Sequence, residues 1–267
     1  MRKAPIGGRG FGKSPLQRAA FIDTNKINEF KQFVKTTTGY APGEKKLSFL
    51  QNLLVKSAIW QKWLGPERLR PLFWGRVGPA FIHGYTVESR ILLLDLMEKF
   101  KILKPQSTRN IVSMYSAQGL LELYLGRKFP GCEITAVDFA GRAIRLGRAY
   151  AKKLRIENVK FVKADARDTK LPSNKYDIAV IAFAAPDVEL VKTLKEAKRL
   201  LDNKKTTHLV IARPVNAKLT GPLMALGLSH LASKMGFAKV FSATMSLYEQ
   251  PNKDITFAIF KLGARSA

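Results

Sequence analysis

The sequence predicts an α/β fold, namely a doubly wound, mostly parallel seven-stranded sheet with an N-terminal helical extension. Three observations lead to this fold class. Short apolar segments alternate with amphipathic helical segments between residues 87 and 262. Residues 176–182 are almost wholly apolar, as a buried parallel strand should be. A turn at residues 249–254 joins the last two strand segments directly, which predicts an antiparallel hairpin at one edge of the sheet.

Hydrophobic spacing predicts the elements of the main domain in order. Helices are predicted where apolar residues recur every three or four positions, and strands where short apolar runs stand between turn residues. The predicted elements are a helix at residues 87–100, a strand at 110–114, a helix at 120–128, a strand at 133–137, a helix at 142–154, strands at 159–163 and 176–182, a helix at 188–201, a strand at 207–212, a helix at 223–235, and strands at 238–246 and 255–262. Such alternation requires crossover connections, and therefore a parallel sheet.

Composition divides the chain into three regions. They are a basic, glycine-rich arm or targeting segment at residues 1–22, a helical and loop extension at residues 23–85, and the α/β domain at residues 86–267. In the extension, apolar residues fall at helical spacing in residues 25–37 and again in residues 44–63. These patterns predict two amphipathic helices packed on the main domain. Because lysines line their polar positions, the alternative is a substrate-binding appendage.

The charge balance predicts an anionic partner. Lysine and arginine number 46 against 20 aspartate and glutamate, a formal net charge of +26. Nucleic acid is the commonest neutralising partner, and an anionic membrane surface is the next. No apolar run approaches the ~20 residues that a spanning helix requires, so no membrane span is predicted. The single cysteine, Cys132, excludes an internal disulfide framework and a cysteine-rich zinc site, and no metal is predicted.

The first twenty residues carry several cations and no acid. The cations are Arg2, Lys3, Arg9, Lys13 and Arg18. One interpretation is a flexible arm that lies along a phosphate backbone. Another is a mitochondrial targeting segment, which would place the protein in the mitochondrial matrix rather than in the cytoplasm or nucleolus. The third is an ordinary solvated terminus. The glycines within residues 7–12 argue against the amphipathic helix of a targeting segment.

Residues 65–84 form a second candidate RNA-binding segment. Arg68, Arg70 and Arg76 are interleaved there with aromatic residues. Such a mixture suits single-stranded RNA, because bases stack on rings while guanidinium groups contact phosphates. The alternative is a connecting loop whose aromatic side chains fill the core.

Several motifs of the α/β domain stand in a familiar order. Asp138 ends the second strand, 19 residues after Gly119, close to the ~20 expected of a ribose-binding acid. Asp165 and Ala166 follow the third strand, and Gly236-Phe237 precedes the sixth. With this order, residues 87–262 resemble the class I S-adenosylmethionine-dependent methyltransferases. The resemblance implies that Asp138 binds the cofactor's ribose and that Asp165 accepts from its adenine amino group.

The glycine-rich loop of that family is altered here. Ser113 stands where the family has an acid that helps to hold the methionine amino group. Tyr115 and Ala117 replace two glycines, and only Gly119 remains. The resemblance therefore assigns to cofactor binding Ser113, Tyr115, Ala117, Gly119, Asp138, Asp165 and Ala166. The Tyr115 ring is expected either to fill the methionine end of the site or to swing out and cover the ligand.

The sequence identifies no catalytic residue. Pro186 and Asp187 follow the fourth strand, where the family places the methyl acceptor, and are assigned to substrate binding. Cys132 precedes the second strand, on the wrong side of the sheet for a nucleophile. Methyl transfer from a sulfonium can proceed by alignment alone when the acceptor is already nucleophilic, so a missing base does not exclude an enzyme.

These observations give one leading hypothesis and two alternatives. The first is a methyltransferase-like RNA-binding protein that acts on ribosomal RNA or a ribosome precursor, together with ribosomal or assembly proteins, and transfers a methyl group from S-adenosylmethionine if it is active. The main alternative is a catalytically inactive methyltransferase-fold module with a structural or assembly role in a ribonucleoprotein, mitochondrial if the targeting interpretation holds. The third is a small-molecule or protein methyltransferase whose basic surface attracts an anionic substrate.

The basic arm generates a first prediction. If residues 1–20 bind phosphate, their deletion should lower RNA affinity and flatten its salt dependence, because each phosphate contact releases counterions. Five cations account for up to about four or five units of the slope of log affinity against log salt on a duplex. An unchanged slope in a salt titration would contradict the arm hypothesis. Mitochondrial import of a fusion carrying only these residues would support targeting instead.

Overall fold

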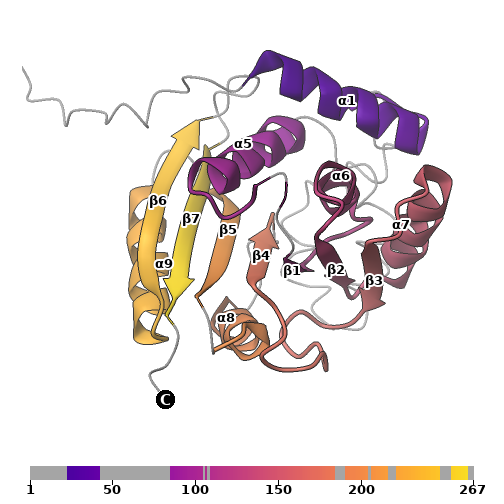
Figure 1. The fold of residues 1–267 in the computed structure, drawn as a ribbon. Coiled ribbons are helices and arrows are strands. Elements are labelled where there is room, and N and C mark those ends of the chain that lie inside the picture. Colours follow the sequence, from indigo (N-terminus) through magenta and orange to yellow (C-terminus); the bar gives the residue numbers. More distant parts are fainter. Residues whose placement is uncertain are drawn as a thin grey trace, which may run out of the picture.

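A computed structural model places the predicted elements in three dimensions (Figure 1). It describes residues 23–42, 85–104, 106, 109–183, 190–203, 206–215, 221–246 and 254–263. The basic arm, the predicted helix at residues 44–63, the arginines of residues 65–84 and the pair Pro186 and Asp187 lie outside the described residues. Nothing in the structure therefore tests the RNA-binding and acceptor-side predictions made for them.

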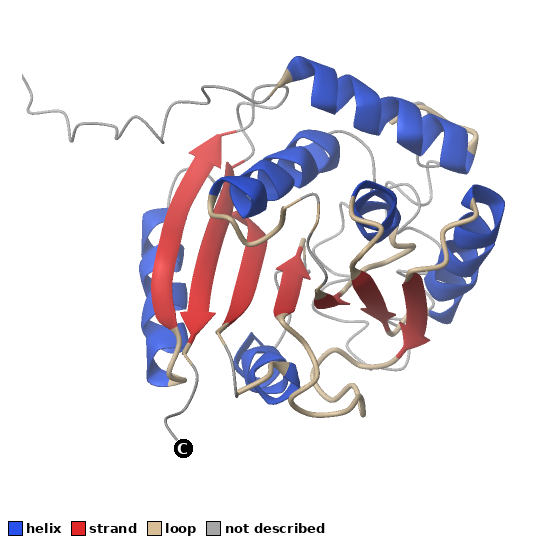
Figure 2. Cartoon of the chain, in the orientation of Figure 1, coloured by secondary structure: helices blue, strands red, loops and turns tan. Residues whose placement is uncertain are grey.

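Seven strands form one sheet in the order β3-β2-β1-β4-β5-β7-β6. The strands are β1 (Asn110–Met114), β2 (Glu133–Asp138), β3 (Val159–Lys163), β4 (Ile178–Ala182), β5 (Thr207–Val215), β6 (Ala238–Ser246) and β7 (Asp254–Leu262). Strands β1 to β5 are parallel, and β7 runs antiparallel to both β5 and β6. The predicted doubly wound sheet is confirmed. The predicted hairpin is also present, with β7 inserted beside β5 so that β6 forms the edge (Figure 2).

Helices cover both faces of the sheet and create two apolar cores. The helices are α1 (Thr24–Thr38), α5 (Tyr85–Lys99), α6 (Leu120–Lys128), α7 (Gly141–Leu154), α8 (Leu190–Leu200) and α9 (Gly221–Lys234). Side chains of α1, α5, α6 and α7 form the core of one face, and those of α8 and α9 form the core of the other. The central strands contribute residues to both cores, because successive side chains of a strand point to opposite faces.

Two strand boundaries differ from the predicted ones by more than one residue, and the structure shows why. β4 begins at Ile178 rather than at residue 176, because Tyr176 bridges to Leu201 and the Asp177 carboxylate accepts from the Asn110 amide at 2.8 Å. β5 continues to Val215, beyond the predicted end at residue 212. This extension includes Pro214 and pairs only with β7, since β4 has already ended. A proline is tolerated in a strand where no neighbour requires its missing amide.

The first helix of the extension, α1, is docked on the main domain as predicted. The rings of Phe30 and Phe33 lie 4.9 and 5.4 Å from that of Tyr124 on α6, both in edge-on contact. At the start of the same helix, the Lys26 ammonium contacts the Asp95 carboxylate of α5 at 2.5 Å. The aromatic contacts supply most of the stabilisation, because a part-exposed ion pair contributes only about 0–1 kcal/mol.

Phe161 of β3 sets how closely α6 and α7 approach the sheet. A β-carbon added at Gly119, before α6, would lie 2.3 Å from the Phe161 ring, and one added at Gly147 of α7 would lie 2.2 Å from it. The ring is buried between these two glycines. A side chain added at either position would therefore meet the ring at a distance shorter than real β-carbon contacts show.

We therefore predict that Gly147→Ala destabilises the protein by about 1–3 kcal/mol, although alanine is the better helix former. Phe161→Leu in the same chain should restore part of that loss, because the shorter side chain makes room for the added methyl group. Urea unfolding of the two single variants and the double variant measures this coupling. Additive effects of the two changes would show that the ring does not limit the approach of α7.

Candidate functional site

The sequence-predicted cofactor residues gather at the carboxyl ends of β1, β2 and β3. The strand order reverses between β1 and β4, because β1 continues to β2 and β3 on one side while β4 and β5 lie on the other. Ligands of open α/β sheets bind beside the carboxyl ends of the strands at such a reversal. The loop from Met114 to Leu120 lies at this position and is the centre of the candidate site.

The loop after β1 keeps a left-handed backbone although two of its expected glycines are absent. Tyr115, Ala117 and Gly119 have φ angles of 64°, 50° and 71°. A side chain in this region costs roughly 1–2 kcal/mol per residue, so Tyr115 and Ala117 hold the loop in a strained conformation. Backbone hydrogen bonds retain it, since the Ser116 amide donates to the Val137 carbonyl at 3.0 Å and the Gly119 amide donates to the Ser116 carbonyl at 2.8 Å.

Asp138 fixes this loop from the end of β2. One carboxylate oxygen accepts from the Ala117 amide and the other from the Ala140 amide, each at 2.8 Å. The residue is only 7% exposed. Burial raises the pKa of Asp138, and the hydrogen bonds from Ala140 and Ala117 oppose that rise. From the sequence alone, a carboxylate at a strand end is expected to contribute little to the stability of the fold. Asp138 instead connects β2, the loop and the start of α7.

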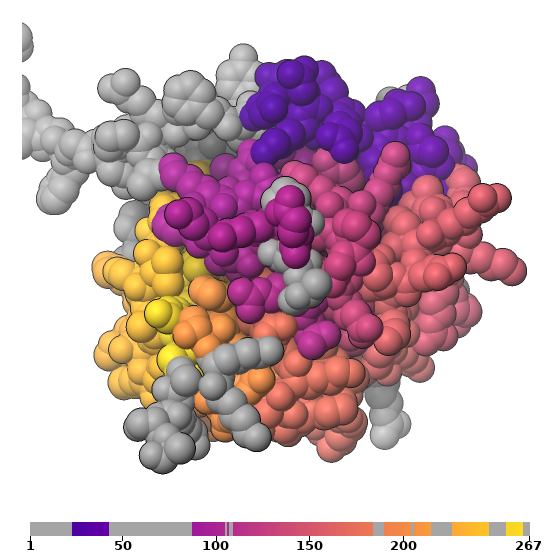
Figure 3. Space-filling model, in the orientation of Figure 1, coloured from indigo at the N-terminus to yellow at the C-terminus, as the bar shows by residue number. Residues whose placement is uncertain are grey.

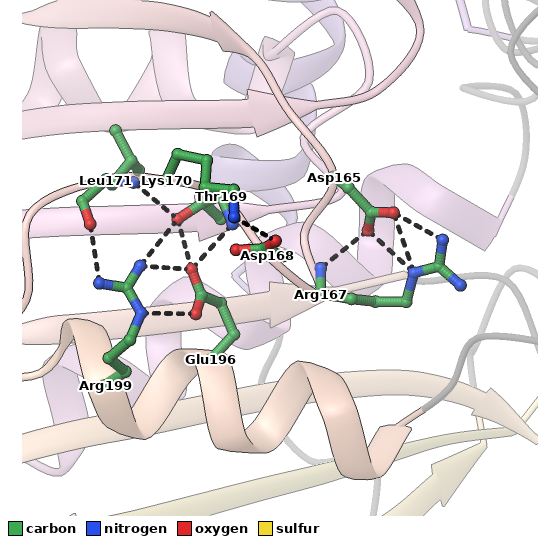
Figure 4. A network of polar contacts seen from close by, with 8 residues as sticks. All are labelled: Asp165, Arg167, Asp168, Thr169, Lys170, Leu171, Glu196 and Arg199. Atoms are coloured by element: carbon green, nitrogen blue, oxygen red, sulfur yellow. Dashed lines mark hydrogen bonds and ion pairs between the residues drawn. The ribbon is translucent and has the colours of Figure 1, made fainter.

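Asp165 lies after β3 with a partner that the sequence did not indicate. Its carboxylate accepts from the Arg167 side chain at 2.6 Å and from the Arg167 amide at 2.8 Å (Figure 4). The Arg167 hydrogen bonds lower the pKa of Asp165. Its side chain is about two-fifths exposed, so it is accessible to a ligand, whereas the neighbouring Ala166 is buried.

A second polar cluster fastens the segment after Asp165 to α8. Thr169 donates to the Glu196 carboxylate through its amide at 2.8 Å and its hydroxyl at 2.5 Å, and Arg199 donates to the same carboxylate at 2.6 Å (Figure 4). Burial alone would raise the pKa of Glu196, but the bonds from Arg199 and Thr169 lower it. The cluster thus sets the position of α8 relative to the site.

Tyr115 points inward, toward α8. Its hydroxyl lies 2.7 Å from the Thr193 hydroxyl on that helix, and its ring packs against the core of the α8 and α9 face. Burial raises the pKa of Tyr115 to about 12. Since Tyr115 follows β1 and α8 follows β4, the side chain crosses the place where the strand order reverses. The structure thus turns the ring toward the core of this face, and a position over a bound ligand stays a prediction.

Sequence reasoning missed Glu122 of α6. Its carboxyl accepts from the Ser113 hydroxyl at 2.5 Å, and both residues are almost fully buried, at 2% and 1% exposed. Burial raises the pKa of Glu122. An acid on the following helix thus lies beside Ser113, where the resemblance led us to expect an acid on β1. The only available signal was a glutamate three residues after Gly119, which reads equally well as a helix cap.

Several buried acceptors lie in and next to this loop. Among the described residues, one oxygen each of Ser116, Gln118 and Glu122 is buried without a hydrogen-bond partner. Buried polar atoms are nearly always satisfied, so a cluster of exceptions calls for a donor that is not part of the chain. The amino group of a bound amino-acid moiety would supply such donors. The residues present therefore fit S-adenosylmethionine, with Glu122 and Gln118 toward its amino end and Asp138 and Asp165 toward its adenosine end.

Comparisons with known proteins agree with this architecture. Residues 111–204 match the methyltransferase domain family. The demethylmenaquinone methyltransferase of Thermus thermophilus is 30% identical over 97 residues, which cover 36% of this chain and 44% of that protein. The Listeria welshimeri enzyme of the same name is 23% identical over 106 residues, covering 39% and 45%. The chain thus spans less than half the length of these curated relatives.

Solved structures extend the likeness in fold. The [4+2]-cyclase SpnF has a TM-score of 0.60 at 14% identity and covers 73% of this chain and 95% of its own. The PH0226 protein of Pyrococcus horikoshii has a TM-score of 0.54 at 20% identity and covers 71% and 98%. The protein has the class I methyltransferase fold. Together with the match at residues 111–204, this fold supports a class I S-adenosylmethionine-dependent methyltransferase.

Two other residues with reactive side chains, Cys132 and His208, lie away from the site. Cys132 is buried just before β2, at the opposite end of that strand from Asp138. His208 is half-buried within β5, and burial lowers its pKa. Within the described part of the chain, no group of three or more potential ligands could hold a metal ion. No helix among the described residues has the length and apolarity that crossing a membrane requires.

Glu122 generates a prediction on pH dependence. With no ligand bound, burial raises the pKa of Glu122, so the folded chain holds this proton more tightly than the unfolded chain does. A cationic amino group bound beside it would favour the charged, accepting form instead. For the ligand-free chain, the free energy of unfolding should therefore fall as the pH rises through the raised pKa of Glu122. Glu122→Gln should remove that fall, so the variant gains stability relative to the original chain toward neutral pH. Urea unfolding at a series of pH values measures the difference, and parallel curves for the two proteins would contradict the assignment.

Proposed function

We propose that this protein binds S-adenosylmethionine at the loop after β1 and transfers its methyl group to RNA, within ribosomal RNA or a ribosome precursor. The observation that carries the cofactor half is the set of buried, unpartnered acceptors on Ser116, Gln118 and Glu122, beside a loop whose backbone Asp138 holds in place. The family match at residues 111–204 supports the same cofactor.

Each residue of the site has a defined task in this proposal. When bound, the cofactor supplies an electrophilic methyl group on a sulfonium. The Asp138 oxygens, which already orient the loop, accept from the ribose hydroxyls with their remaining lone pairs. Asp165 accepts from the adenine amino group, and Arg167 keeps that carboxylate charged. The Glu122 carboxyl accepts from the amino end. Pro186 and Asp187, outside the described residues, are proposed to face the acceptor.

The acceptor half of the proposal rests on charge. A formal net charge of +26 on 267 residues favours a polyanionic partner, and RNA is the commonest of these. Ribosomal or assembly proteins are proposed as neighbours in the same particle, and the mitochondrial matrix as its location if residues 1–22 are a targeting segment. The matched relatives are named as demethylmenaquinone methyltransferases. This chain spans less than half of their length.

A specific observation favours a second candidate function. The Tyr115 side chain crosses the reversal point of the sheet and its hydroxyl is satisfied by Thr193. The Asp138 and Asp165 carboxylates also have partners within the chain. The internal partners of these three side chains support an inactive module that uses the fold as a structural or assembly part of a ribonucleoprotein.

Replacement of Tyr115 tests both candidates. Tyr115→Gly should strengthen S-adenosylmethionine binding by about 1–2 kcal/mol, or about 5- to 30-fold, because the ring no longer has to be displaced. Glycine also adopts the positive φ of this position without strain. Tyr115→Phe is the matched control: it keeps the ring and removes only the bond to Thr193, so it should gain less affinity than Tyr115→Gly. Calorimetric titration with the cofactor and with S-adenosylhomocysteine measures all three proteins.

The outcomes separate the alternatives. Weaker binding by Tyr115→Gly would show that the ring covers the bound ligand and does not block its site. This result leaves the enzyme proposal intact. No binding by the unchanged chain or by Tyr115→Gly at millimolar ligand would overturn the enzyme proposal, and the assembly module would take its place. Methylation of RNA by the unchanged chain, if that methylation depends on Asp138, would overturn the assembly module.

A further inference from the structure

Helix α7 is rich in positive charge and contains no acid. Its fourteen residues, Gly141 to Leu154, read GRAIRLGRAYAKKL. The cations are Arg142, Arg145, Arg148, Lys152 and Lys153. Like charges three or four positions apart repel each other along a helix. The isolated protein therefore carries an unfavourable electrostatic term here, which an anionic partner would relieve.

The cations of α7 form an outward stripe. Residues 142, 145, 149 and 152 follow the i, i+3, i+7, i+10 pattern of one helix face, and all four are exposed. Three of them are cations and the fourth is Ala149, a small residue that does not obstruct a flat approach. The opposite face of the helix is buried through Ala143, Ile144, Gly147 and Ala151.

Elsewhere in the described structure many cations are neutralised by acids. Lys26 contacts Asp95, Lys128 contacts Glu98 at 2.5 Å, and Lys170 contacts Asp168 at 2.7 Å. Within the described residues, no carboxylate forms an ion pair with Arg142, Arg145 or Lys152. The charge of this helix is thus available to a partner outside the chain.

The stripe begins at the candidate site and leads away from it. The Ala140 amide, directly before α7, donates to Asp138, and the side chains of Arg145 and exposed Lys163 flank Gly141 at the start of the helix. At the other end, the Lys153 ammonium donates to the Thr36 carbonyl of α1 at 2.7 Å. Figure 3 shows α1 beside this end of α7 on one face of the molecule. A helix of this length covers about 21 Å.

We propose that the outward face of α7, together with Lys163, binds the phosphate backbone of RNA and guides the strand to the carboxyl ends of β1 and β2. This inference rests on the proposed function, since it names the surface that would hold the RNA. Arginines suit the task because their guanidinium groups bind phosphate oxygens through two parallel hydrogen bonds. Backbone contacts of this kind position a nucleic acid without reading its sequence.

A charge-matched pair of variants of the full chain tests the surface. The first is Arg142→Gln, Arg145→Gln and Lys152→Gln on α7. The control removes the same charge from exposed positions elsewhere: Lys195→Gln of α8, Lys234→Gln of α9 and Lys239→Gln of β6. Binding of a labelled ribosomal RNA hairpin is measured over a range of salt concentrations. The α7 variant should lose about two to three units of the slope of log affinity against log salt, and the control should retain the original slope.

A second variant uses repulsion instead of removal. Ala149→Glu places one negative charge in the centre of the stripe, and Ala149→Gln provides the uncharged control of the same size. Ala149→Glu should weaken RNA binding at least fivefold at low salt, and Ala149→Gln should not. Circular dichroism of each variant checks that α7 remains folded.

Three results would contradict the proposed RNA-binding surface on α7. Equal losses of slope in the α7 variant and in its control would overturn the α7 surface while leaving RNA binding itself in place. Absence of salt-dependent RNA binding by the unchanged chain would overturn the RNA assignment and this surface with it. Binding to phosphatidylserine vesicles that depends on Arg142, Arg145 and Lys152, without RNA binding, would identify the surface as a membrane contact and contradict the proposal.

Discussion

The hydrogen bonds of the Asp138 carboxylate are the interaction on which the rest of the site depends. One oxygen holds the amide of Ala117 in the loop after β1, and the other holds the amide of Ala140 before α7. Two left-handed residues that bear side chains would relax if this anchor were absent. The same carboxylate therefore keeps the loop strained, sets where α7 begins and presents the acid expected to meet a ribose. One side chain thus has both a structural role in the fold and a proposed role in the site.

The fold could be predicted from the sequence because its elements have unambiguous hydrophobic patterns. Residues 110–114 and 159–163 were predicted with the bounds of β1 and β3, and α6 with the bounds Leu120–Lys128. The extension of β5 to Val215 could not be predicted, since Pro214 reads as a strand end unless the early end of β4 is known. The local hydrophobic pattern indicates where a strand lies, whereas the length of the strand depends on which neighbouring strand it pairs with.

The candidate site was predictable only in part, for a different reason. Asp138 and Asp165 could be located because strand ends bring them to one edge of the sheet. The role of Glu122 depends on which face of α6 packs against β1, and periodicity does not specify which buried position meets Ser113. The direction of Tyr115 depends on its positive φ and on Thr193, seventy-eight residues later. The [4+2]-cyclase among the structural neighbours shows that the fold alone does not determine the reaction.

The docking of α1 has a consequence for how the chain folds as it is synthesised. The contact between Lys153 and the carbonyl of Thr36 joins residues 117 positions apart. A helix of fifteen residues is only marginally stable by itself in water, and the apolar side of α1, with Phe30 and Phe33, is buried only after α6 and α7 have left the ribosome. Complete burial of the apolar side of α1 is therefore delayed while more than a hundred further residues are translated. This side is fully covered only once α7 has been translated, ahead of the later strands β4 to β7.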